Sequence, residues 1–165
     1  MRNSWVSRNR SEAGFTLTEM MVVTGLFLII VGIVVANVLH LPGQLSLAGT
    51  TSSIVSDLKT QQLRSMLGDT EGTSTAKTYG INFLGNKYVE YGAPYNSNDV
   101  SNFTVNLGAD LLVTTSLPSG QITFNRISGE VTGFTPGSNT VTVTNIYTGE
   151  QKMLIINRYG AITIQ

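Results

Sequence analysis

The sequence predicts an α+β fold in which a long N-terminal helix, first apolar and then amphipathic, packs on a small antiparallel β-sheet or sandwich domain. Three observations support this fold. An apolar run carries no charge, the stretch after it has helical periodicity, and the C-terminal part consists of short alternating runs separated by turn residues. The 165 residues leave room for one modest soluble domain beside such a helix.

The first 14 residues form a basic leader, and the apolar run follows it. Arg2, Arg8 and Arg10 precede the run, and residues 20–39 contain no charged side chain. About 20 apolar residues suffice for a helix that crosses a hydrocarbon core of ~30 Å. We therefore predict a transmembrane or filament-core helix over residues 15–41, with the leader in the cytoplasm and the rest outside.

Two residues distinguish this segment from an ordinary secretory signal. Glu19 places one carboxylate a single turn inside the apolar helix, where a charge near the bilayer centre costs about 2.5–3.5 kcal/mol. The small residue Gly14 lies before the apolar core, whereas a secretory signal has its cleavage site after the core. Cleavage between Gly14 and Phe15 would leave the helix on the mature protein.

The series Gly14-Phe15-Thr16-Leu17-Thr18-Glu19 with its apolar helix resembles the class III signal of type IV pilins and type II secretion pseudopilins. The resemblance implies that prepilin peptidase cuts after Gly14 and methylates the new amine of Phe15. It also implies that Glu19 pairs with the N-terminal amine of a neighbouring subunit in the filament. Two charges that are both costly in lipid would then stabilise each other. A plain signal anchor with Glu19 at the headgroup level is the alternative, but it leaves the Gly-Phe junction unexplained.

Residues 42–68 are expected to form an amphipathic extension of the helix. Pro42 predicts a kink or local break near residues 38–42, because proline removes a backbone donor and clashes with the preceding turn. The apolar stripe of the extension is expected at Leu47, Ile54, Val55, Leu58 and Met66. Gly68 is the expected end of this helix.

Residues 69–165 are expected to form an extracytoplasmic antiparallel β domain. Turn residues separate seven to nine short runs that alternate or are rich in β-branched side chains. The expected strands are 78–84, 87–91, 102–107, 111–117, 121–126, 129–132, 140–147, 152–157 and 161–164. Gly85 and Asn86 join the first two strands, and glycine at the first position suits a type II′ turn.

Composition argues against an enzyme. Charged residues make up 12% of the chain, cysteine is absent, and His40 is the single histidine, at the predicted membrane exit. Zinc sites and Cys–His pairs therefore lack their side chains, and Ser-His-Asp catalysis would require His40, which the helix holds at the membrane surface. Asp99 and Asp110 are isolated and lack the alternating oxygen ligands of a calcium loop, so we expect neither a metal nor a cofactor.

The C-terminal part resembles the GspH/FimT group of minor pseudopilins and minor pilins, through Phe124-Asn125-Arg126, Ser128-Gly129 and Tyr159-Gly160. These resemblances imply a structural subunit of a type IV pilus or type II secretion filament. Its partners would be prepilin peptidase, other pilin or pseudopilin subunits and the bacterial inner membrane.

A DNA-binding minor pilin for DNA uptake is a second alternative, with Arg126 and Arg158 as possible contacts. After residue 14 the chain has seven basic and nine acidic residues, a net charge of −2, which disfavours a general nucleic-acid surface.

Overall fold

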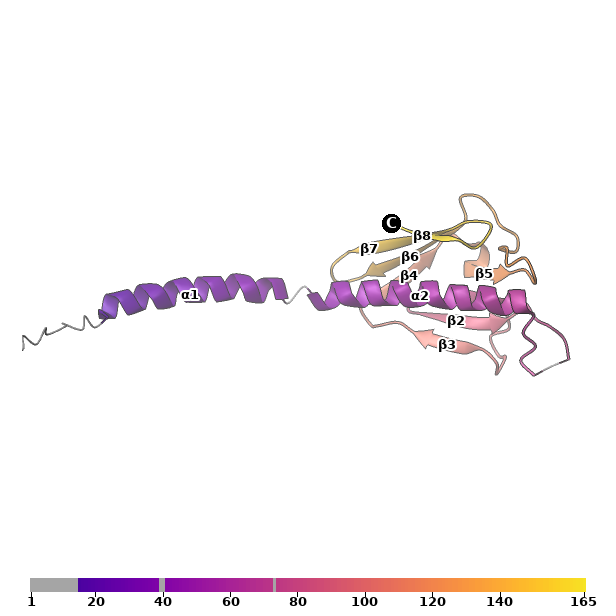
Figure 1. Ribbon diagram of the computed structural model, residues 1–165, viewed down its shortest axis with the longest axis horizontal. Coiled ribbons are helices and arrows are strands. Elements are labelled where there is room, and N and C mark those ends of the chain that lie inside the picture. The colour runs from indigo at the N-terminus through magenta and orange to yellow at the C-terminus, as the bar shows by residue number, and fades with distance from the viewer. Residues whose placement is uncertain (1–14, 39–40, 73) are drawn as a thin grey trace, which may run out of the picture. The chain divides into compact units, whose positions relative to one another are not determined.

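The computed structural model describes residues 15–38, 41–72 and 74–165, with side chains described except in residues 34–38 and 41–45. The chain divides into two compact units, with the boundary between His40 and Leu41. Helix α1 (Leu17–Val38) belongs to the first unit. Helix α2 (Leu41–Leu67) and all strands belong to the second, which confirms the predicted α+β class (Figure 1).

The first unit contributes a single helix. Among the described residues, no helix combines the length and the hydropathy that crossing a membrane requires. The predicted span over 15–41 includes residues 39–40, which lie outside the described part of the chain. The predicted break near 38–42 falls on the same two residues, so the kink stays a prediction. Pro42 is the second residue of α2, in the first turn, where backbone N–H groups have no intrahelical acceptor and proline is tolerated.

The second unit contains two four-stranded antiparallel sheets. The first has the order β3-β2-β1-β5 and the second the order β4-β6-β7-β8. Their bounds are β1 Tyr79–Phe83, β2 Lys87–Gly92, β3 Phe103–Asn106, β4 Leu111–Thr115, β5 Gln121–Phe124, β6 Thr140–Asn145, β7 Gln151–Ile156 and β8 Ile162–Ile164. A short 3₁₀ turn, η1 (Pro118–Gly120), precedes β5. Eight of the nine predicted strands are therefore present, and residues 129–132 make only one isolated bridge, between Val131 and Phe124.

One face of α2 covers both sheets. Helix α2 packs on β1 and β5 of the first sheet and on β6 and β7 of the second. Its fully or almost fully buried side chains follow the heptad-like series Leu47, Thr51, Ile54, Leu58, Gln61 and Ser65. A single hydrophobic core contains Leu47, Ile54 and Leu58 together with residues of both sheets.

The predicted apolar stripe is therefore wrong at one position. Met66 is 42% exposed, and the polar residues Gln61 and Ser65 take the buried places beyond Leu58. Ser65 is tolerated there because its Oγ accepts a hydrogen bond from the backbone N–H of Tyr79 at 2.7 Å. Helix α2 ends at Leu67, and Gly68 has the positive φ of 67° that its predicted role as a helix stop requires.

An ion-pair network closes the connection from α2 to β1. The Arg64 guanidinium lies 2.8 Å from a carboxylate oxygen of Asp69 and 2.7 Å from one of Glu71. Lys77 lies 3.1 Å from the second oxygen of Glu71, and Arg64 also covers the ring of Tyr79 at 4.0 Å. The end of α2 and the start of β1 are thereby held together.

A substitution in the middle of β1 tests the packing of the first sheet. In Gly80→Ala the added Cβ would lie 2.1 Å from the backbone oxygen of Ile122 in β5, so the two strands must separate. We expect a loss of at least ~3 kcal/mol in the free energy of unfolding, measured by chemical denaturation. Gly49→Ala is the matched control, because its Cβ meets no atom within 4 Å in α2 and should stabilise by about 0.5–1 kcal/mol. Equal effects of the two variants would contradict the described β1–β5 contact.

Candidate functional site

Thr16 caps the N-terminal end of α1. Its side-chain oxygen accepts a hydrogen bond from the backbone N–H of Glu19 at 3.2 Å, and its backbone oxygen accepts from Met20 at 3.2 Å. Thr16 is therefore the N-cap, and Glu19 stands at the third helical position, the spacing of a capping box. Phe15 precedes this cap and is 76% exposed. Gly14, the other residue of the predicted cleavage junction, lies outside the described residues.

The Glu19 carboxylate is exposed in the first turn of α1. A negative charge is favourable there, because the helix dipole places partial positive charge at its N-terminus. Among the described side chains, Glu19 has no ion-pair partner within the chain. Glu19 thus lies in a capped helix start, and its carboxylate is exposed.

The described surface of α1 is apolar on all sides. Every described side chain from Phe15 to Ile33 is exposed, including Met20, Val23, Phe27 and Ile30. The hydroxyl of Thr24 donates to the backbone oxygen of Met20 at 2.7 Å, so its hydrogen-bond donor is satisfied within the helix. A helix that is apolar all round needs an apolar environment or partner helices.

The two aspartates considered for a calcium loop serve local structure instead. Asp99 accepts hydrogen bonds from the backbone N–H and the hydroxyl of Ser101 at 2.9 and 2.8 Å. These bonds lower the pKa of Asp99, and the bond from the backbone N–H has the largest effect. Asp110 accepts from the side chain of Asn145 at 3.3 Å. Within the described residues, no group of three or more His, Asp or Glu side chains is placed to hold a metal ion.

The two arginines proposed as DNA contacts lie in neighbouring turns. The backbone N–H of Val131 donates to the oxygen of Arg158 at 2.8 Å, which joins the segment after Arg126 to the turn after β7. Arg126 is exposed, whereas Arg158 lies 3.5 Å from the carboxylate of Glu130. Part of the positive charge of this region is therefore balanced within the chain, and a phosphate would compete with Glu130.

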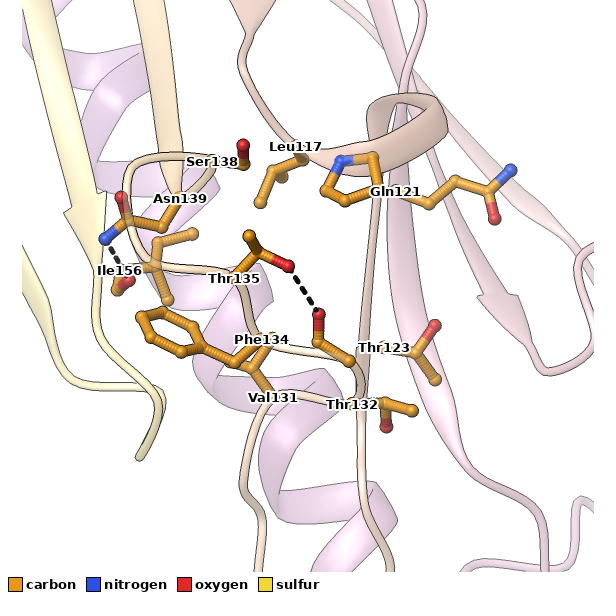
Figure 2. Close-up of a pocket in the computed structure, with 12 residues that line it drawn as sticks. Leu117, Gln121, Thr123, Val131, Thr132, Phe134, Thr135, Ser138, Asn139 and Ile156 are labelled. Atoms are coloured by element: carbon orange, nitrogen blue, oxygen red, sulfur yellow. Dashed lines mark hydrogen bonds between the residues drawn. The ribbon is translucent and has the colours of Figure 1, made fainter.

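A small cavity lies between η1, β5 and the segment after Val131. It has a volume of about 200 Å³, below the roughly 300–1,000 Å³ of typical ligand pockets. Figure 2 shows Phe134 next to Ile156 on one side and Gln121 and Thr123 on the other. No charged residue lines the cavity, so it suits at most a small neutral group.

A polar cluster between α2 and β2 was not predicted from the sequence. The hydroxyl of Tyr88 donates to Asp57 at 2.5 Å, and the side-chain amide of Gln61 donates to Glu90 at 2.5 Å. Burial raises the pKa of Glu90, with the nearby charge of Asp57 as the second cause, and burial likewise raises the pKa of Tyr88. These pairs join residues 29 and 31 positions apart, so no local motif in the sequence indicates them.

The cluster predicts a pH dependence of stability. The pKa of Glu90 is higher in the folded chain than its ordinary value of 4.5. The folded state therefore binds this proton more tightly, and the contribution of Glu90 to stability falls as pH rises above that ordinary value. We expect the unfolding midpoint of Glu90→Gln to equal that of the wild type near pH 4 and to exceed it increasingly toward pH 7. A difference between the two midpoints that stayed constant from pH 4 to pH 7 would contradict the raised pKa of Glu90.

Comparison with known proteins identifies the N-terminal segment. A family model described as the prokaryotic N-terminal methylation motif matches residues 9–35, which include Gly14, Phe15 and Glu19. No curated protein and no solved structure matches the chain. The motif is consistent with the type IV pilin and pseudopilin family, whereas no finding supports the narrower resemblance to the GspH/FimT group. The chain therefore carries a class III prepilin signal.

Proposed function

We propose that the chain is a structural subunit, a minor pilin or pseudopilin, of a type IV pilus or type II secretion filament. The methylation motif over residues 9–35 carries the proposal. Prepilin peptidase removes the leader after Gly14 and methylates Phe15, and α1 anchors the subunit in the inner membrane until assembly. The assignment to a minor subunit rests on the resemblance of the C-terminal part to the GspH/FimT group.

The chemistry of α1 supports assembly through this helix. Its described side chains are mostly apolar and all exposed within their own unit, so lipid before assembly and neighbouring helices afterwards would both cover them. The single carboxylate, Glu19, lies in the first turn, and no described side chain of the chain forms an ion pair with it. The methylated amine of Phe15 in an adjacent subunit is the partner that this arrangement fits.

The N-terminus of the mature chain tests the processing step. We expect protein purified from membranes that contain prepilin peptidase to begin at Phe15 with a methylated amine, as determined by mass spectrometry of the intact chain and its N-terminal peptide. A chain that begins at Met1 under these conditions would identify a signal-anchored β domain and would remove the filament proposal.

The role of Glu19 has its own test. We expect Glu19→Ala to reach the membrane at the wild-type level but to enter filaments at least ~100-fold less, because removing one partner of a buried ion pair costs about 3–5 kcal/mol. The measurement compares the subunit content of sheared filaments with that of membranes. Thr16→Ala is the matched control, because it weakens the α1 cap and keeps the carboxylate. An equal defect in both variants would show that Glu19 only supports the helix start.

A further inference from the structure

The polar cluster between α2 and β2 contains two carboxylates that form no ion pair with a described side chain. It consists of Asp57 and Gln61, one turn apart on α2, and of Tyr88 and Glu90, two residues apart on one face of β2. Figure 1 shows β2 alongside α2. Both carboxylates, Asp57 and Glu90, are half-buried.

Arg64 compensates these two negative charges only in part. Burial is the main cause of the raised pKa of Glu90, the charge of Asp57 raises it further, and the charge of Arg64 opposes both. The Arg64 guanidinium, however, lies 2.8 Å from Asp69 and 2.7 Å from Glu71, so two other carboxylates share its charge. Charges that are removed from water are ordinarily paired or bind a metal ion. Asp57 and Glu90 therefore form a place where a further positive charge is favourable.

The side chain of Gln61 gives a second, independent indication of a ligand. Gln61 is completely buried, and its Nε2 atom donates to Oε2 of Glu90 at 2.5 Å, which places the amide group at the cluster. Oε1 of the same amide is also buried, but it accepts no hydrogen bond from a described residue. A buried acceptor without a donor is unfavourable. A cation would satisfy this oxygen and the two carboxylates together, because amide and carboxylate oxygens both bind hard cations.

The packing of α2 and β2 holds these oxygens in place. β2 lies inside the first sheet and pairs with β1 on one side and with β3 on the other. On α2, Leu58 follows Asp57 directly and is completely buried in the core. The Tyr88 hydroxyl donates to Asp57 at 2.5 Å and so orients its carboxylate. A groove between α2 and β3 reaches Tyr88, and the half-buried carboxylates are themselves open to solvent, so an ion has a path to the cluster.

We propose that Asp57, Glu90 and the Oε1 atom of Gln61 bind one calcium ion between α2 and β2. Calcium accepts carboxylates, amide oxygens and waters in a flexible geometry, whereas magnesium demands a nearly regular octahedron. Two carboxylates provide less charge than a high-affinity calcium loop, so we expect a Kd of about 10⁻⁴–10⁻³ M. All three ligands lie in the second unit, so the inference does not depend on assembly through α1.

The proposed site is a different kind of site from a cluster of acidic side chains. The described residues contain no group of three or more His, Asp or Glu side chains that could hold a metal ion. Here two carboxylates are combined with an amide oxygen, and the three side chains come from a helix and a strand. The bound ion would connect α2 to β2, beside the core that both elements share.

Terbium luminescence tests for the ion in the full chain, purified in detergent. Tb³⁺ occupies calcium sites and emits light when an excited tyrosine lies close to it, so Tyr88 serves as the donor beside Asp57. We expect Tb³⁺ emission on tyrosine excitation, and we expect excess Ca²⁺ to remove it. Tyr88→Phe should lower the emission several-fold, whereas its unfolding temperature should still rise with Ca²⁺.

Thermal unfolding measures the same binding without a probe ion. We expect about 10 mM Ca²⁺ to raise the unfolding midpoint of the wild type by roughly 3–10 °C. Asp57→Asn and Glu90→Gln should abolish this rise, and both should fold without calcium because each removes a repelling charge. Asp99→Asn is the matched control, since it removes one carboxylate outside the cluster and keeps the Oδ1 acceptor for Ser101. Gln61→Met, which lacks the amide oxygen, should bind Ca²⁺ several-fold more weakly.

Four results would overturn the proposal. The first is the absence of both a calcium-dependent rise and Tb³⁺ emission that Ca²⁺ displaces. The second is an equal rise with Mg²⁺ or an equal response of Asp57→Asn and Asp99→Asn, which would show general screening of charge. The third is a midpoint that rises on acidification to pH 4 but not with calcium, which would show that the pair takes up only a proton. The fourth is an unchanged affinity in Gln61→Met, which would remove the amide oxygen from the ligands.

Discussion

The structure of the second unit depends on the burial of one face of α2 against both sheets. Ile54 and Leu58 are fully buried in a core that takes residues from β1 and β5 on one side and from β6 and β7 on the other. Among the strands of the described residues, no pairing joins the two sheets, so the helix provides much of the connection between them. The same helix carries Lys59 and Gln62, which bind the backbone of Gly160 and Gly129, and Ser65 and Arg64, which fix the start of β1. Folding of the core and the position of these turns therefore depend on one element.

Local sequence signals were sufficient for the helices and for eight strands, because β-branched runs and positive-φ glycines act over a few residues. They could not assign the strands to two sheets, since that depends on pairing between distant segments. Residues 129–132 satisfy the strand pattern and return alongside β5, where the backbone N–H of Thr132 donates to Thr123 at 2.8 Å, but only Val131 forms a bridge. At the functional segment, the junction and Glu19 could be identified because the signal is contiguous. The Gln61–Glu90 pair and the strain at Ile127 could not, because both depend on contacts or backbone angles that no residue type indicates.

The two units differ in where their apolar side chains lie. The β domain closes its own hydrophobic core, whereas the described part of α1 buries none of its apolar side chains within its unit. In the proposed assembly, lipid or neighbouring helices would cover this apolar surface. Glu19 lies at the start of the same helix, where its backbone N–H donates to the side chain of Thr16 and its carboxylate is exposed.

Ile127 combines a positive φ with an exposed apolar side chain. The folded domain holds this residue in a conformation that a glycine or an asparagine would adopt at lower cost, and it gains no burial in return. Selection for the stability of the isolated domain alone would favour replacement, because relief of such strain is gained without loss of a core contact. An apolar side chain at this position is instead favourable when its exposed surface is removed from water by another molecule.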